Sequence, residues 1–171
     1  YLKNGYYYYS RFEKDLEYRI HCRKKGSLDA EEEIILDENT LAEGYDYFSI
    51  GGMSISPDNK WLAFGVDPVS RRVYEVRFKN LKTGDILATS IENSTGSVAW
   101  ANDSQTVFYT SKNETTLLGE KIWRHKLGTE NSDVMVYHET DETFYNGVYR
   151  SKSGKFIIIY HSSTLLTDYQ I

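Results

Sequence analysis

Cysteine, proline and long apolar runs are scarce or missing in this chain. Cys22 is the only cysteine among 171 residues, which excludes an intrachain disulfide and with it the small disulfide-scaffold class. Two prolines are too few for a Pro-rich linker. No apolar run approaches the ~18 residues that a transmembrane helix needs, so we expect no membrane partner.

An excess of positive charge is also missing. The formal net charge is −5, with a charged fraction of 26%. Nucleic-acid binding needs a basic surface, so we expect no nucleic-acid partner. The local cluster Arg23-Lys24-Lys25 is interpreted as a solvated hairpin turn before Gly26.

Motifs that carry chemistry are absent as well. The sequence has no G-x-S-x-G, H-E-x-x-H, C-x-x-C, G-x-x-x-x-G-K-[ST] or G-x-G-x-x-G pattern. We interpret Glu31–Glu33 as a solvated strand edge and Cys22 as a structural thiol. We therefore predict no catalytic, cofactor-binding or metal-binding residue in this chain, and we assign no substrate-binding residue. The four histidines are scattered singly and are interpreted as structural or surface residues: His21, His125, His138 and His161.

A short module recurs three times along the sequence. It begins at residues 55, 100 and 150 and consists of a small polar turn followed by a β-rich apolar run; the copies are Ile55–Phe64, Trp100–Tyr109 and Arg150–Ile159. A period of roughly 40–50 residues built from short strands is typical of β-propeller blades. A β-sandwich also contains many short strands, but it would not explain why this module recurs.

The turn signals place the blades. We predict an all-β chain, a β-propeller fragment with about two complete four-stranded blades and two partial ones. The chain is expected to enter after the first strand of one blade and to stop inside a fourth. The boundaries are residues 1–38 (partial blade), 48–91 and 96–139 (whole blades) and 145–171 (partial blade), with 37–47 as an irregular connection. The expected strands include Tyr6–Arg11, Leu16–Arg23, Glu33–Leu36, Trp61–Val66, Val73–Lys79, Ile86–Thr89, Gly96–Trp100 and Thr106–Thr110, and the third blade turns at Gly128–Asp133.

Several longer strings resemble a known family. Asn4–Arg11, Arg23–Gly26, Glu33–Asn39 and Ser54–Asp58 resemble the start of the propeller in the oligopeptidase B group of the prolyl oligopeptidase family. The resemblance is densest over residues 4–87 and stays in register to the end of the chain.

This resemblance implies a function for a longer polypeptide. Family members are serine peptidases in which a seven-bladed propeller caps an α/β-hydrolase domain with a Ser-Asp-His triad. They need no cofactor, and in oligopeptidase B they cut short peptides after Arg or Lys. The propeller acts as a size filter. The chain would be the amino-terminal propeller part, inert by itself, with the hydrolase domain of the same polypeptide and short peptides as its partners. The alternative is a propeller that only binds partners or acts as a scaffold, and a downstream G-x-S-x-G would decide between the two.

Two further expectations concern the cell and the isolated chain. The lone cysteine and the resemblance favour the cytoplasm, with the periplasm as the alternative. An open arc of blades exposes sheet faces and unpaired edges. We therefore expect the isolated chain to be poorly stable or to associate with itself.

Overall fold

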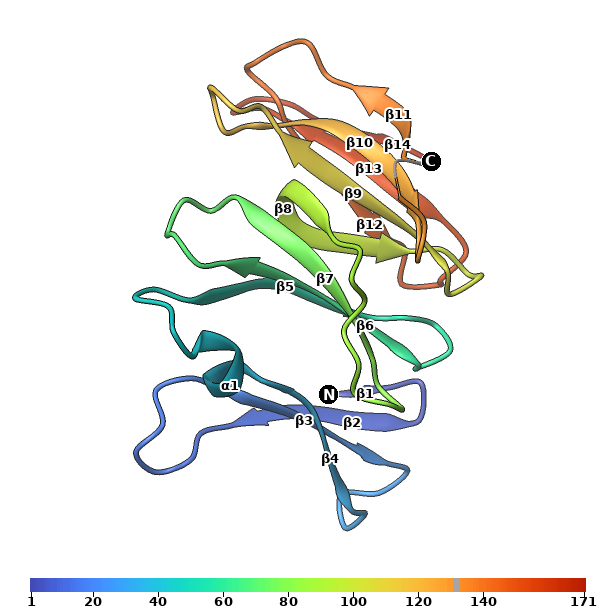
Figure 1. Cartoon of the computed structure of the whole chain (residues 1–171). Coiled ribbons are helices and arrows are strands. Elements are labelled where there is room, and N and C mark those ends of the chain that lie inside the picture. The colour runs from blue at the N-terminus through green and yellow to red at the C-terminus, as the bar shows by residue number, and fades with distance from the viewer. Residues whose placement is uncertain (131–132) are drawn as a thin grey trace. The chain divides into compact units, whose positions relative to one another are not determined.

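The computed structural model describes residues 1–130 and 133–171, and almost all of its regular structure is β-strand (Figure 1). This confirms the predicted all-β class. The chain divides into two compact units, Tyr1–Phe48 and Ser49–Ile171.

The first unit is one antiparallel sheet with its strands in chain order. Asn4 and Gly5, both with positive φ (48° and 79°), form the two-residue turn of the first hairpin. Two residues of a strand thus precede this turn, whereas the sequence predicted that the chain enters after that strand. The four strands are β1 (Leu2–Lys3), β2 (Tyr6–Arg11), β3 (Ile20–Lys25) and β4 (Glu32–Asp37).

The second hairpin has a longer loop than predicted. Arg11 pairs with Ile20, so residues 12–19 lie outside the ladder and β3 begins four residues after the predicted Leu16. Phe12 and Leu16 are exposed, and Asp15 has a φ of 66°. A residue in the left-handed region interrupts an extended strand. The exposed apolar side chains also gain no burial that would favour pairing with the sheet.

The basic cluster is strand rather than turn, which corrects the prediction. Arg23 is only 5% exposed. Its guanidinium lies 4.2 Å from the centre of the Tyr6 ring, and its Nε donates to Glu33 at 2.8 Å. An aromatic face and a carboxylate together allow an arginine to be buried in a sheet. The sequence of one strand does not reveal which side chains on the neighbouring strands will pair with its charges.

A short helix interrupts the connection that was predicted to be irregular. Helix α1 spans Glu38–Ala42 and begins where the carboxylate of Asp37 accepts the backbone N–H of Asn39 at 2.9 Å. An aspartate in this position is a favoured N-cap. The side chain of Asn39 also accepts from the backbone N–H of Tyr18 and donates to its carbonyl, so the helix holds the end of the 12–19 loop.

The second unit contains a seven-stranded and a three-stranded antiparallel sheet. The long strand β8 belongs to two blades at once. Tyr74 and Val76 of β7 pair with its first half, and β9 pairs with Val98–Trp100 in its second half. The strands are β5 (Ser49–Ile55), β6 (Trp61–Asp67), β7 (Tyr74–Asn80), β8 (Ile91–Trp100), β9 (Thr106–Lys112), β10 (Gly119–Lys126), β11 (Val134–His138), β12 (Tyr145–Arg150), β13 (Ile157–Ser162) and β14 (Thr167–Gln170).

This sharing of β8 corrects the prediction of an outer strand at Ile86–Thr89. Only an isolated bridge between Lys79 and Ile86 forms there, and the start of β8 takes the place of the outer strand. The predicted turn at Gly128–Asp133 includes residues 131–132, which lie outside the described residues.

The recurring module has one geometry in all three copies. In the first, the N–H of Ser56 donates to the carbonyl of Trp61, and the N–H of Asn59 donates to the carbonyl of Ser56, both at 2.9 Å. The same two bonds join Ala101 to Thr106, Ser104 to Ala101, Ser151 to Phe156 and Gly154 to Ser151. The fourth residue is left-handed each time, as Asn59 (62°), Ser104 (57°) and Gly154 (71°) show. The repeat seen in the sequence is therefore a repeat of backbone structure.

The first strands of three successive blades, β5, β8 and β12, are neighbours in space. Glycines allow this approach. A Cβ on Gly52 would lie 2.7 Å from the Cα of Ser97, and one on Gly65 would lie 2.6 Å from the Cα of Gly96. Of the adjacent glycines in β5, Gly52 allows the close backbone contact, whereas Gly51 faces the ring of Tyr74.

Candidate functional site

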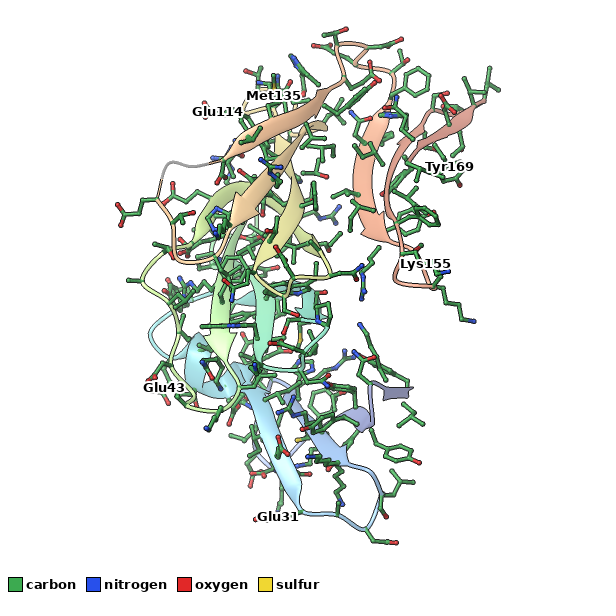
Figure 2. All side chains as sticks on the ribbon, turned by 90° about the vertical axis from the view of Figure 1, so that its right-hand side faces the viewer. Glu31, Glu43, Glu114, Met135, Lys155 and Tyr169 are labelled. Carbon is green, nitrogen blue, oxygen red and sulfur yellow. The ribbon has the colours of Figure 1, made fainter. Side chains whose placement is uncertain are left out.

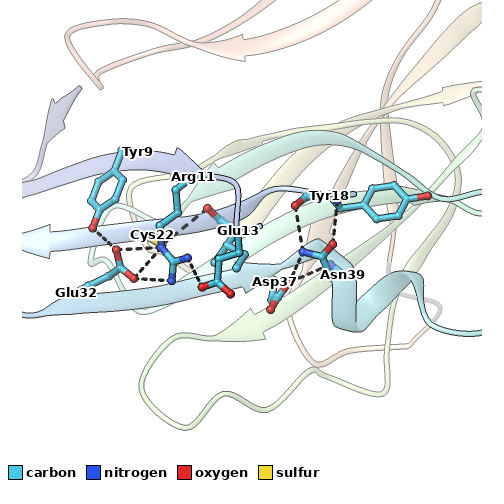
Figure 3. A network of polar contacts seen from close by, with 9 residues as sticks. Tyr9, Arg11, Glu13, Tyr18, Cys22, Glu32, Asp37 and Asn39 are labelled. Atoms are coloured by element: carbon cyan, nitrogen blue, oxygen red, sulfur yellow. Dashed lines mark hydrogen bonds and ion pairs between the residues drawn. The ribbon is translucent and has the colours of Figure 1, made fainter. Parts of the chain in front are cut away.

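Two of the three acids at the start of β4 are paired with arginines, and Figure 3 shows the pairing of Glu32. Glu32 accepts Nη2 of Arg11 at 2.9 Å and the hydroxyl of Tyr9 at 2.5 Å, and Glu33 bonds the buried Arg23. This corrects the interpretation as a solvated edge for Glu32 and Glu33, whereas Glu31 is exposed as expected. The bond from Arg11, followed by that from Tyr9, lowers the pKa of Glu32, and the bond to Glu32 raises the pKa of Tyr9 to about 12. The group joins three strands, and the thiol drawn beside it in Figure 3, that of Cys22, is fully buried.

We expect Glu32→Gln to bring the pKa of Tyr9 down toward its ordinary value of about 10. A carboxylate with a lowered folded pKa stabilises the fold above its unfolded pKa, and this contribution is lost as the pH falls through the folded value. The raised pKa of Tyr9 stabilises the fold below about pH 10, and this stabilisation is lost as the pH rises from about 10 to 12. The stability difference between wild type and variant should therefore be largest between about pH 5 and 9.

Carbon-13 NMR of labelled tyrosine, with Tyr9→Phe to assign the signal, measures this pKa. Glu13→Gln is the matched control, because Glu13 bonds Arg11 without being bonded to Tyr9. A Tyr9 pKa that stays near 12 in the Glu32→Gln variant would contradict the assignment.

The four histidines lie on four different strands. His21 of β3 contacts Glu38 at 2.5 Å. His161 of β13 bonds Asn146 at 2.6 Å, and its ring lies 4.4 Å from that of Tyr137 at an interplanar angle of 46°. His138 of β11 is exposed. Among the described residues, no three His, Cys, Asp or Glu side chains form a group that could hold a metal ion.

His125 belongs to a buried polar group on the seven-stranded sheet. Its Nδ1 lies 2.7 Å from one oxygen of Asp133, whose other oxygen accepts the hydroxyl of Tyr109 at 2.7 Å. Burial and then Asp133 raise the pKa of Tyr109. The group borders a hollow of about 530 Å³. The Nε2 of His125 is itself buried, so this imidazole cannot contact a molecule in the hollow as a base.

A second hollow, of about 240 Å³, has an acidic lining. It lies between the loop from β9 to β10 and the loop from β11 to β12. The acids are engaged locally: Glu120 with Lys121, and Asp141 with Thr143. These bonds lower the pKa values of both carboxyl groups. The hollow therefore repels anions, and its acids also order the two loops. The lining includes Glu120, His138, Glu139, Asp141, Glu142, Leu118 and Phe144.

Cys22 is fully buried, and burial raises the pKa of its thiol. A thiol without access and with a raised pKa is a poor nucleophile, as the sequence indicated. No helix in the described part of the chain is long and apolar enough to cross a membrane.

Sequence reasoning missed the pairing partners of the acids. Glu32 with Arg11, and Asp133 with His125, are separated by 21 and 8 residues, and only the strand register brings each pair together. The one available signal was the alternation along β2, which places the side chains of Tyr9 and Arg11 on the same face of the sheet.

The strand order, the shared turn geometry and the adjacent first strands define the class: this is a part of a β-propeller whose described residues contain no assembled catalytic group. The family model "Prolyl oligopeptidase, N-terminal beta-propeller domain" matches residues 1–168. The chain therefore belongs to the prolyl oligopeptidase family, and it is an amino-terminal propeller portion of that family of peptidases.

Individual relatives agree with this membership. The chain is 38% identical to dipeptidyl aminopeptidase BI of Pseudoxanthomonas mexicana over 98% of its length, and 36% identical to protease 2 of Moraxella lacunata over 95%. Each alignment covers 25% of the relative.

Solved structures show the same fold. Oligopeptidase B from Leishmania major superposes with a TM-score of 0.92 at 29% identity, and oligopeptidase B from Trypanosoma brucei, with covalently bound antipain, with 0.90 at 34%. Both cover 99% of this chain and 24% of theirs. The chain thus spans about a quarter of the relatives it matches.

Proposed function

We propose that the polypeptide containing this chain is a serine oligopeptidase that cleaves short peptides after Arg or Lys. The observation that carries the proposal is the likeness to two oligopeptidase B structures over 99% of the chain. The described residues contain no nucleophile activated by a neighbouring base, so catalysis is assigned to a hydrolase domain of the same polypeptide. We place this protein in the cytoplasm.

The role of this chain in that enzyme is to restrict access by size. A blade depends on its neighbours, and here the shared strand β8 joins two blades into one sheet. Such a wall is stiff, because separating the blades would break a continuous strand. A stiff ring admits short peptides and holds back folded proteins.

The full-length polypeptide should hydrolyse a fluorogenic Arg-Arg substrate with a blocked amino terminus, whereas the 171-residue chain alone should not. The reason is that this chain holds no activated nucleophile among its described residues. Release of the fluorophore at neutral pH measures both. A matched substrate with Gln in place of Arg is the control for specificity.

The blocked terminus also separates the proposal from the activity named in another relative, a dipeptidyl aminopeptidase. Hydrolysis of free dipeptide substrates only would assign that activity instead. No hydrolysis of any substrate by the full-length polypeptide would favour a binding or scaffold propeller. A series of peptides from about 8 to about 60 residues with one Arg each tests the size limit, and equal rates for a folded protein would contradict it.

A further inference from the structure

The outer strand β11 is an open and apolar sheet edge. Among the described residues it pairs with β10 alone and ends the seven-stranded sheet. Val134, Met135 and Val136 are 46%, 50% and 47% exposed, and Met135 marks this outer strand in Figure 2. An edge of this kind offers unpaired backbone N–H and C=O groups together with apolar side chains.

The outer edge of the first unit carries charged side chains, whereas the edge residues of β11 do not. The outer strand of the first unit, β4, begins with Glu32 and Glu33, which are held by arginines. Charges on an edge strand discourage the addition of another strand. The four residues Val134–Tyr137 contain no charge and no proline, so nothing in their side chains opposes strand addition.

Both ends of β11 are fixed by buried histidines. At one end Asp133 bridges Tyr109 and His125, with both contacts at 2.7 Å. At the other end the ring of Tyr137 lies 4.4 Å from that of His161, and the Tyr137 hydroxyl donates to Glu139 at 2.9 Å. An edge fixed in this way loses little conformational entropy when a partner strand is added.

The charge of the chain segments that flank β11 in the sequence selects the partner. Residues 127–149 contain five acids and no Lys or Arg. The acids are Glu130, Asp133, Glu139, Asp141 and Glu142. Two copies of β11 side by side in antiparallel order would bring Asp133 of one against Glu139 of the other, which is a like-charge contact. A peptide with cations at its ends would instead meet opposite charges.

We propose that the open edge of β11 binds an extended peptide as an added strand, with β-branched residues in the middle and Arg or Lys at both ends. Backbone hydrogen bonds supply affinity, and the half-exposed valines and flanking acids supply selectivity. The inference does not depend on the proposed peptidase activity, because β11 would bind such a peptide whether or not it is cleaved.

The test uses the full-length polypeptide and a fluorescein-labelled peptide, D-Arg-Thr-Val-Thr-Val-Thr-D-Arg with an amide end, whose D-arginines resist hydrolysis. Fluorescence anisotropy measures its binding, and hydrogen exchange of residues 134–138 reports its place. We expect binding that weakens with salt and slower exchange at β11. The same peptide with D-Glu at both ends is the control and should bind at least about tenfold more weakly.

Val136→Lys is the main variant. The register between β10 and β11 skips Val136, so the substitution leaves the ladder intact and adds a cation at the edge. Binding should weaken at least about tenfold. Leu165→Lys, at a residue 96% exposed between β13 and β14, is the matched control and should bind as wild type does.

A double variant, Glu130→Gln with Glu142→Gln, removes charge only. It should weaken binding about threefold at low salt, with no difference at about 0.5 M salt. Unchanged binding in Val136→Lys, or equal binding of the acidic peptide, would overturn the proposal. So would a dimer that Val136→Lys dissociates and that binds no peptide, since the edge would then serve a second copy of the chain. Activity without peptide binding would overturn this inference and leave the proposed function standing.

Discussion

Replacing Gly65 by alanine should lower the free energy of unfolding by about 3 kcal/mol or more, at the upper end of overpacking costs. Gly65 lies in β6, where its missing side chain leaves room for β8. An added Cβ would lie 2.6 Å from both the Cα and the carbonyl oxygen of Gly96. Real Cβ atoms do not approach other atoms so closely, and the atoms met here are backbone. They can give way only if β8 moves at the point where it passes from one blade to the next.

Gly84→Ala separates crowding from backbone strain. Gly84 has a φ of 83°, and no atom beyond its two chain neighbours lies within 4 Å of the place that a Cβ would occupy, so alanine there costs about 1 kcal/mol from the left-handed conformation alone. Urea unfolding followed by tryptophan fluorescence measures both variants, because Trp61, Trp100 and Trp123 all lie in the second unit. Equal losses for the two variants would show that β6 and β8 are not in close contact.

The sequence allowed the local elements to be predicted well, because turn chemistry is local. The residues at 59, 104 and 154 stand at the fourth place of a polar turn, and all three are left-handed. Within the predicted strand Val73–Lys79, Val76 and Phe78 alternate with Glu75 and Arg77, and both apolar residues are buried.

What could not be predicted depends on pairing between distant residues. The segment at Ile86 has strand composition, yet β8 occupies its place beside β7. Arg23 looked like a solvated turn because its ring and carboxylate partners lie on neighbouring strands. No catalytic motif was found in the sequence, and the described residues assemble none, so the function rests on the family and on experiment.

Phe78→Ala should lower the free energy of unfolding by about 3–5 kcal/mol. Phe78 is completely buried. Its ring meets Trp100 edge-on, with centroids 6.1 Å apart, and lies parallel to His125 at 5.9 Å. The three rings come from β7, β8 and β10. Phe78 therefore connects the two blades that share β8. Truncation would leave a cavity. β8 could fill it only by breaking its backbone hydrogen bonds to β7 and β9.

Phe156→Ala is the matched control, since Phe156 is 50% exposed and its truncation should cost less than about 1 kcal/mol. Thermal and urea unfolding measure the stability difference, and near-ultraviolet circular dichroism should show a changed environment for Trp100 only in the Phe78 variant. Similar small losses in both variants would contradict a core shared between blades. A large loss confined to Phe78→Ala would support a core that two blades share, because the rings that Phe78 contacts lie on β8 and β10.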